Sequence, residues 1–139
     1  MEKMKKPLKV SIYTQKGGVG KSTITTLLAS ALHYRLGYNV LIIDCDFPQY
    51  SLSNMRDRDK VSIMNSEYHK KVAMKQFQAI NKKAYPIIKT KAEIALETAV
   101  ENIDQQSVKP DIVFFDLPGI RYFDFSILYH NALRNLHYS

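Results

Sequence analysis

A glycine-rich run constrains this sequence more than any other stretch: Gln15-Lys-Gly-Gly-Val-Gly-Lys-Ser-Thr23. The β-rich residues 8–14 precede it, and apolar residues recur every three or four positions after Ser22 until Gly37 supplies a stop signal. A strand that turns through glycines into a helix brings several backbone N–H groups together at the positive end of the helix dipole. The run therefore predicts a phosphate-binding loop.

Side chains within the run complete the predicted site. Glycine is required because a side chain would keep the backbone away from the phosphate oxygens. Lys21 supplies a point charge for the β- and γ-phosphates, and the Ser22 hydroxyl is placed to bind Mg²⁺. Gln15 stands where the usual pattern has glycine, so the run matches a variant with an additional lysine, Lys16. The predicted ligand is Mg-ATP, and its predicted contacts are Gly17, Gly18, Val19, Gly20, Lys21, Ser22 and Thr23.

Carboxylates follow two apolar predicted strands. Asp44 and Asp46 follow one of these strands, and Asp116 follows the other. Ligands of open parallel sheets bind at the carboxyl ends of strands, so these acids are candidates for binding Mg²⁺ and for orienting water. The alternative for Asp44 and Asp46 is capping a helix or bonding within a loop. Gly119 is predicted to present an N–H group to the γ-phosphate.

Strands and helices alternate along the chain, which predicts an α/β fold. Strands are predicted at residues 8–14, 38–44, 85–89 and 111–116, and helices after residue 22, at 69–80 and at 90–105. The polar residues 47–66 have no sustained period and predict a loop. We expect three layers of the P-loop NTPase type, with a mostly parallel sheet of about four strands.

The two later helices are expected to bury one face each. The predicted contacts of residues 69–80 are Val72, Phe77 and Ile80, in an apolar stripe that the lysines make narrow. Those of residues 90–105 are Leu96, Ala99, Val100 and Ile103. Thr90 and Glu93 fit a capping box, in which side chains bond the free N–H groups of a first helical turn.

Length and composition indicate one ordinary globular domain. The chain has 139 residues, of which 45 % are hydrophobic and 24 % charged, close to the roughly 45–50 % and 25 % of soluble proteins. No apolar run approaches the ~20 residues that span a bilayer, and the lysine-rich start lacks the apolar stretch of a secretory signal. We therefore expect a cytoplasmic protein. Cys45 is predicted to be a small buried side chain rather than a reactive thiol.

The net charge of +7 is unevenly distributed. One segment carries lysines with no acidic residue among them: Lys70, Lys71, Lys75, Lys82, Lys83, Lys89 and Lys91. Such a segment is able to meet DNA phosphates or an anionic surface, although a solvated helix face is the commoner explanation. Non-specific DNA is therefore one partner to test.

Three stretches resemble the ParA/MinD family of partition and positioning ATPases. They are Lys16-Gly-Gly-Val-Gly-Lys-Ser-Thr23, Asp44-Cys-Asp-Phe-Pro-Gln49 and Phe115-Asp-Leu-Pro-Gly119, and their order and spacing also agree. The resemblance covers about residues 8–119. The run Asp46-Phe-Pro-Gln-Tyr-Ser-Leu52 is most similar to ParA-type proteins carried on conjugative transposons of bacteria.

The resemblance implies an ATPase with a two-lysine, deviant Walker A loop that acts as an ATP-dependent dimer. Lys16 would reach the partner's phosphates, Lys21 would bind the phosphates of its own subunit, and Asp46 would position the hydrolytic water. Asp44 and Asp116 would lie in the Mg²⁺ shell. Non-specific DNA or membrane binding controlled by nucleotide is also implied.

Residues 120–139 do not resemble the usual continuation of the family, which has further strands and helices. We therefore expect a truncated member with a partial version of the family fold. Residues 1–119 would form the nucleotide-binding domain, and residues 120–139 an atypical tail, with Phe125, Tyr129, Leu133 and Leu136 on one face of a helix. The first strand would then be an exposed apolar edge that favours self-association.

Three functions are open on the sequence alone. The first is ParA-like binding of Mg-ATP, with slow, dimer-dependent hydrolysis that is weak or absent in this short chain. The second is a catalytically inactive relic or a nucleic-acid interaction module that uses the lysine segment without nucleotide. The third is a small-molecule kinase or ligase with the same loop type, for which no acceptor site is visible.

Overall fold

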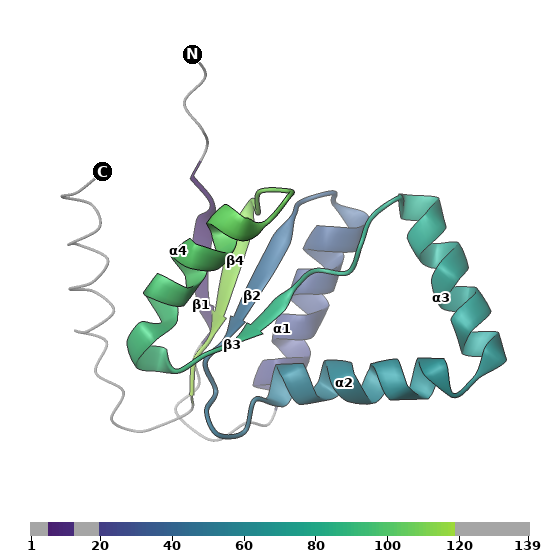
Figure 1. The fold of residues 1–139 in the computed structure, drawn as a ribbon, viewed down its shortest axis with the longest axis horizontal. Coiled ribbons are helices and arrows are strands. Elements are labelled where there is room, and N and C mark those ends of the chain that lie inside the picture. Colours follow the sequence, from purple (N-terminus) through teal and green to yellow (C-terminus); the bar gives the residue numbers. More distant parts are fainter. Residues whose placement is uncertain (1–5, 13–19, 119–139) are drawn as a thin grey trace, which may run out of the picture.

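Residues 6–12 and 20–118 are described by the computed structural model, in which strands and helices alternate (Figure 1). The strands are β1 Leu8–Ile12, β2 Val40–Asp44, β3 Ile87–Lys89 and β4 Ile112–Asp116. The α-helices are α1 Lys21–Ser30, α2 Ser51–Met64, α3 Glu67–Ile80 and α4 Ala95–Gln105. A π-helical turn, Ala31–Arg35, extends α1, and a 3-10 turn, Ala92–Ile94, leads into α4. None of these helices is long and apolar enough to cross a membrane.

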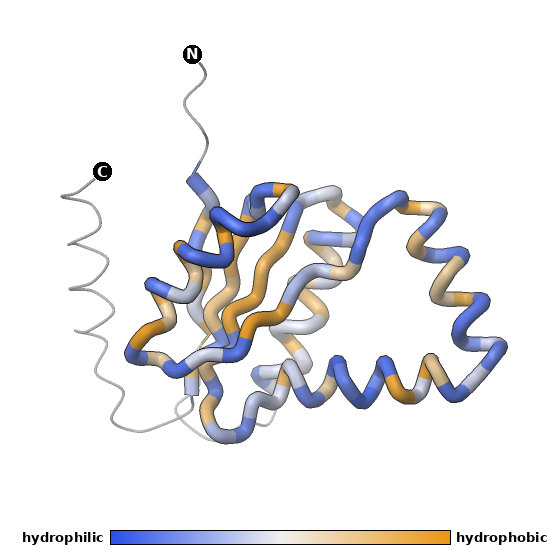
Figure 2. Tube along the Cα trace, viewed as in Figure 1, coloured by the Kyte–Doolittle hydropathy of each residue, from blue (hydrophilic) through white to orange (hydrophobic). Residues whose placement is uncertain are grey.

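The strands form one parallel sheet in the order β1-β4-β2-β3. β4 lies between β1 and β2, in a register that pairs Asp116 with Ile12 on one side and with Asp44 on the other. Every residue of β2 and β4 is buried, and both strands are apolar up to their final aspartates (Figure 2). Uniformly apolar strands suit a position covered on both faces. The predicted α/β fold with a parallel sheet of four strands is confirmed.

Helices cover both faces of the sheet and divide the core in two. On one face, α4 packs against side chains of β2 and β4 that include Leu41 and Ile43. Successive residues of a strand point to opposite faces, so Val40 and Ile42 point away from α4. They pack with Ala29 of α1 and with the start of α2. The predicted three layers are therefore present.

The loop predicted for residues 47–66 is wrong, because Ser51–Met64 is a helix, α2. Its buried residues, Leu52 and Ser53, belong to the first turn. The remainder projects from the sheet together with α3, and we refer to these two helices, residues 51–80, as the arm (Figure 1). A helix surrounded mainly by water needs no apolar stripe, so its sequence shows no helical period.

The helix predicted at residues 69–80 is confirmed as α3, but its predicted packing is wrong. No residue of α3 is buried. Phe77 and Ile80, which were expected to be buried, are 40 % and 39 % exposed, and Val72 is half-buried. The reason is that α3 packs mainly against α2 and not against the sheet.

The predicted capping box of Thr90 and Glu93 is not formed, and α4 begins later than expected. The residues that precede the 3-10 turn and α4 are Lys91 and Ile94, and neither side chain caps its helix. The Thr90 hydroxyl lies 2.8 Å from the Thr98 hydroxyl instead. The Thr90 hydroxyl therefore pairs with a side chain of α4 instead of with the backbone N–H group that a capping box would use.

The inward face predicted for α4 is confirmed except at one position. Leu96 and Ala99 are buried, and Ile103 packs against the core beside them. Val100 is 46 % exposed. It follows Ala99 directly and is therefore turned about 100° around the helix axis from it.

β1 is an edge strand within the described part of the chain, as predicted. Leu8 at its start is 63 % exposed. The apolar Ile24 and Leu27 of α1 are also exposed, whereas the buried positions of this helix are Lys21, Thr25 and Ala29. The spacing of apolar residues after Ser22 thus predicts the helix correctly, but several of these residues lie on its exposed face and not on its buried one. An open strand edge and an exposed apolar helix face both favour association.

Candidate functional site

The predicted site residues that the structure describes gather at the carboxyl edge of the sheet. α1 begins at Lys21, and β2 and β4 end at Asp44 and Asp116. Gly20, directly before α1, has a φ of +96°, which L side chains rarely adopt, and this conformation explains a glycine at that point of the loop. The other predicted residues, Lys16, Gly17, Gly18, Val19 and Gly119, lie outside the described ranges.

Lys21 is a buried cation, with only 3 % of the residue exposed. Its Nζ lies 3.1 Å from Oδ1 of Asp116 and donates a hydrogen bond to the carbonyl of Leu117. Because Lys21 is the first residue of α1, its charge adds to the partial positive charge of the free N–H groups at the helix start. This edge of the sheet is therefore suited to a phosphate.

Asp116 is buried and incompletely satisfied. Apart from the ion pair with Lys21, neither carboxylate oxygen accepts a hydrogen bond of good geometry from a described residue. Burial raises the pKa of Asp116 to about 6, because desolvation of the charged form outweighs the attraction of Lys21. A buried carboxylate with an unsatisfied oxygen has the capacity to accept a further donor, such as the water shell of a cation.

Asp44 is held by the start of α2. Its Oδ2 accepts hydrogen bonds from the Ser53 N–H at 3.1 Å and from the Ser53 hydroxyl at 2.8 Å. Its Oδ1 accepts a hydrogen bond from the Asp46 N–H at 3.3 Å. Asp44 does not precede α2, whose N-cap residue is Tyr50, but it binds one backbone N–H of the first turn from the end of β2 while lying beside Asp116 in register. Sequence reasoning missed Ser53 because it placed residues 47–66 in a loop, whereas Ser53 lies in the first turn of α2.

Asp46 is more accessible than its two acidic neighbours, since it is half-buried. Its Oδ2 accepts a hydrogen bond from the Ser51 hydroxyl at 3.4 Å. The charges of Asp44 and Asp46 both raise the pKa of Asp116, so the three carboxylates lie within electrostatic reach of one another. Predicted contacts in the first turn of α1 are also accessible, because Ser22 is half-buried and Thr23 is exposed.

Cys45 is buried, as predicted. Its pKa is raised to about 12, because burial and then the Asp44 and Asp116 carboxylates disfavour the thiolate. A thiol with this pKa stays protonated at neutral pH and is a poor nucleophile. Cys45 therefore contributes packing rather than chemistry.

The described side chains suit Mg²⁺ bound together with a phosphate. Within residues 6–12 and 20–118, no three His, Cys, Asp or Glu side chains cluster so as to hold a metal ion. Mg²⁺ commonly uses one or two carboxylates, and waters and substrate phosphates complete its shell. Asp44 and Asp116 supply two carboxylates on neighbouring strands, and Ser22 follows Lys21 in the first turn of α1.

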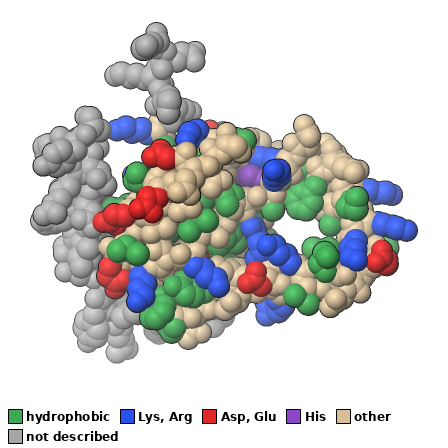
Figure 3. Space-filling model, viewed as in Figure 1, with side chains coloured by type: hydrophobic (Ala, Val, Ile, Leu, Met, Phe, Trp, Pro, Cys, Tyr) green, Lys and Arg blue, Asp and Glu red, His purple; other side chains and the backbone are tan. Residues whose placement is uncertain are grey.

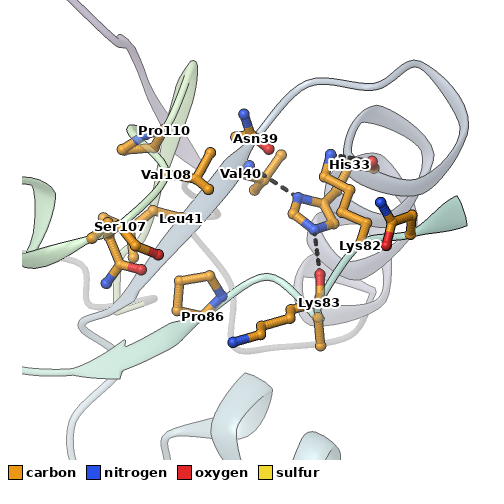
Figure 4. A pocket seen from close by; sticks show the side chains of 13 residues that line it. His33, Asn39, Val40, Leu41, Lys82, Lys83, Pro86, Ser107, Val108 and Pro110 are labelled. Atoms are coloured by element: carbon orange, nitrogen blue, oxygen red, sulfur yellow. Dashed lines mark hydrogen bonds between the residues drawn. The ribbon is translucent and has the colours of Figure 1, made fainter. Parts of the chain in front are cut away.

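A cavity of about 340 Å³ lies at the opposite edge of the sheet, beside the start of β2 (Figure 4). The His33 ring lies at one side of it, with Nδ1 accepting a hydrogen bond from the Val40 N–H at 3.1 Å and Nε2 donating to the Lys83 carbonyl at 2.9 Å. Lys82 donates to the carbonyls of His33 and Tyr38 at 2.6 and 2.7 Å. These polar groups hold the backbone together, and none of the predicted nucleotide contacts lines the cavity.

The predicted DNA-contacting lysines are divided among several elements, and the Lys and Arg side chains on the face shown in Figure 3 are scattered. The predicted lysines lie on α3 (Lys70, Lys71, Lys75), after it (Lys82, Lys83), at the end of β3 (Lys89) and beyond it (Lys91). Lys89 and Lys91 lie 5.5 and 4.8 Å from the ring centres of Tyr50 and Phe47. The segment therefore does not form a single helix face, although Lys71, Lys75 and Lys83 are exposed.

Fold and site together define an α/β domain of the P-loop type. Its sheet is parallel, and its first helix follows a glycine and begins with lysine and serine. Carboxylates lie at the ends of neighbouring strands. Residues 10–128 match the family described as the CobQ/CobB/MinD/ParA nucleotide binding domain. The chain belongs to this family, which confirms the resemblance to ParA and MinD. No curated protein and no solved structure matches the chain.

Proposed function

We propose that this chain binds Mg-ATP at the carboxyl edge of its sheet, as a ParA-like ATPase of DNA partition or conjugative transfer. One observation carries the proposal: Lys21, the first residue of α1, is buried with its Nζ 3.1 Å from Asp116 Oδ1. The lysine that opens a P-loop helix serves the β- and γ-phosphates, and an aspartate at a strand end serves Mg²⁺. Membership of the MinD/ParA nucleotide-binding family supports this assignment.

Nucleotide binding would exchange the partners of Lys21. Its ammonium would leave Asp116 for phosphate oxygens, and the Asp116 carboxylate would then serve the cation's shell together with Asp44 and Ser22. Separating a buried ion pair without new partners would leave two uncompensated charges, so the exchange requires the phosphate to take over Lys21 and the cation to take over Asp116. Bound Mg²⁺ would supply neutralisation of the phosphate charge.

Further phosphate contacts are proposed from the loop sequence. Backbone N–H groups of Gly17, Gly18, Val19 and Gly20 would surround the phosphates, Thr23 would support the α-phosphate, and Gly119 would contact the γ-phosphate. The left-handed φ of Gly20 supports a tight turn at the end of this loop. The helix dipole of α1 would add to their effect.

Hydrolysis is proposed to be slow and to need a dimer. Asp46 is half-buried beside Asp44, where a carboxylate is able to orient an attacking water. Lys16 would act on the phosphates of the partner subunit, and Lys21 on those of its own. A cytoplasmic location completes the proposal.

A second candidate function is nucleic-acid binding without enzymatic work. Exposed lysines on and after α3, namely Lys71, Lys75 and Lys83, favour it. DNA binding that falls with salt and requires ATP would support the partition ATPase. DNA binding that falls with salt and ignores ATP would support an interaction module.

Calorimetry with Mg-ATP tests the proposed nucleotide site. Lys21→Ala should weaken binding about ten- to hundredfold, because it removes a charged hydrogen-bond donor to phosphate. Lys75→Ala is the matched control, since it removes the same charge from the exposed surface of α3, and its affinity should stay within about twofold of the parent. Equal affinities of parent and Lys21→Ala would place the nucleotide elsewhere, and an absence of binding by the parent would contradict the proposal.

A further inference from the structure

A groove of about 380 Å³ runs between α2 and β3, on the far side of the sheet from β1. One wall is α2, whose Ser53, Arg56 and Lys60 recur at three- and four-residue spacing and so share a helix face. The other wall is β3 with the residues before it, and includes Ile87 and Lys89. The groove therefore lies along an edge strand of the sheet.

The free edge of β3 presents backbone groups in the pattern of an unpaired strand. The Pro86 carbonyl accepts a hydrogen bond from the Ile42 N–H, and the Thr90 N–H donates to the Asp44 carbonyl, both at 3.0 Å. Because alternate residues of a strand direct their N–H and C=O groups to opposite sides, Ile87 and Lys89 direct theirs away from β2. Within the described ranges no strand lies on that side. These groups are a template for a further strand.

The groove carries more positive than negative charge. Its lining includes Arg56, Lys60 and Lys89, against the single carboxylate of Asp57. Arg56 is already engaged, since it donates to the Tyr85 carbonyl and its guanidinium carbon lies 4.4 Å from the centre of the Tyr85 ring. Lys60 and Lys89 are exposed. A segment that binds here gains by carrying carboxylates.

The arm extends beyond the edge that β3 forms. In Figure 1, α2 continues past β3 and α3 rises from its far end, and Figure 3 shows a hollow between the arm and the rest of the molecule. A strand added to β3 would thus have α2 beneath it, as β2 has α1 and the start of α2 beneath it. The fold provides a layer for a strand that the described chain does not contribute.

We propose that the groove between α2 and β3 binds an extended acidic peptide segment of a partner protein by strand addition to β3. The peptide backbone would pair with the N–H and C=O groups of Ile87 and Lys89, and its carboxylates would face Lys60 and Lys89. An extended peptide fits better than a nucleic acid, because only a peptide offers donors and acceptors at strand spacing. This groove adjoins the proposed nucleotide site, since Ser53 lines it and also bonds Asp44, but the proposal does not depend on nucleotide binding.

Fluorescence anisotropy of a labelled Val-Glu-Val-Glu-Val-Glu-Val peptide tests the proposal. The peptide should bind, and the same peptide methylated on alternate backbone nitrogens should bind about tenfold more weakly, since it loses ladder hydrogen bonds. The double variant Lys60→Glu, Lys89→Glu should also weaken binding about tenfold. Lys75→Glu, which makes the same charge change on α3, should change it less than about twofold.

Circular dichroism confirms that each variant is folded, and Lys60→Glu alone replaces the double variant if the latter does not fold. Failure of the unmodified peptide to bind would overturn the proposal. So would equal binding of the methylated peptide, or equal losses in the groove variant and in Lys75→Glu. If labelled single-stranded DNA binds and its binding requires Lys60 and Lys89, while the peptide does not bind, the groove is a nucleic-acid site. That result would also overturn the proposal.

Discussion

The carboxyl edge of the sheet and the arm each hold an ion pair of the same length in opposite surroundings. Lys21 and Asp116 lie 3.1 Å apart with their side chains 3 % and 0 % exposed. Lys70 and Glu67 on α3 also lie 3.1 Å apart, but their side chains are 34 % and 81 % exposed. Removing one partner leaves an uncompensated charge in the first case and a hydrated one in the second. Burial, and not distance, therefore decides what each pair does.

The largest effect is expected from breaking the buried pair. Asp116→Ala leaves the Lys21 ammonium buried without its carboxylate and should lower the free energy of unfolding by about 3–5 kcal/mol. Urea denaturation at neutral pH measures the change. A loss below about 1 kcal/mol would mean that Lys21 reaches water readily. The buried pair would then behave like the exposed pair on α3, which would contradict the comparison.

A large difference is also expected between core and arm. Leu41 is fully buried between the sheet and α4, so Leu41→Ala should cost about 2–5 kcal/mol of unfolding free energy. Phe77 on α3 is 40 % exposed, and Phe77→Ala should cost about 1 kcal/mol. The same denaturation experiment compares them. Similar losses for the two variants would show that the arm belongs to the main core.

A smaller, pH-dependent effect is expected at the amino edge of the sheet. Burial lowers the pKa of His33 in the folded chain below the ordinary 6.5 that it has in the unfolded chain. Between the folded and the unfolded pKa, the unfolded chain therefore binds more protons than the folded one. The His33 contribution to stability is therefore complete above pH 6.5 and is lost as the pH falls. His33→Gln keeps an acceptor for the Val40 N–H without titrating. Denaturation at neutral and at mildly acidic pH should show a greater loss for the parent than for this variant, and parallel losses would refute the assignment.

The smallest effect is expected from the exposed pair on α3. Glu67→Gln should lower stability by about 0.2–0.5 kcal/mol at low salt, as for other pairs three or four residues apart on a helix. In molar salt the difference should vanish because the charges are screened. Thermal unfolding at both salt concentrations measures it, and a salt-independent loss above about 1 kcal/mol would indicate that α3 is more enclosed than the structure shows.

The parts of the molecule that sequence reasoning predicts best are those determined by nearby residues. The apolar residues 40–43 and 112–115 predict buried parallel strands, because a strand covered on both faces admits no polar alternation. The glycine-rich run before α1 predicts a tight turn, because that backbone conformation is a local requirement that glycine meets. Gly20, with a φ of +96°, shows that requirement directly.

The parts that it misses depend on how distant elements dock. α2 lacks an apolar stripe because only its first turn meets the core, and the hydrogen bonds from Ser53 to Asp44 exist only once that turn is in place. Lys21 and Asp116 are each predicted as site residues from local motifs. Their direct contact in the described fold follows from the parallel register of β4 with β1 and β2, which no local pattern specifies.

The central claim is that Lys21 and Asp116 belong to a site for nucleotide with Mg²⁺. The most direct measurement is the affinity for a fluorescent ATP analogue, with and without Mg²⁺, of the parent and of Asp116→Asn. The parent should bind more tightly with Mg²⁺, and the variant should lose about ten- to hundredfold of its affinity in the presence of Mg²⁺, as expected when a carboxylate that orders a metal shell is removed. Tight binding by Asp116→Asn with the full Mg²⁺ enhancement of the parent would contradict the account.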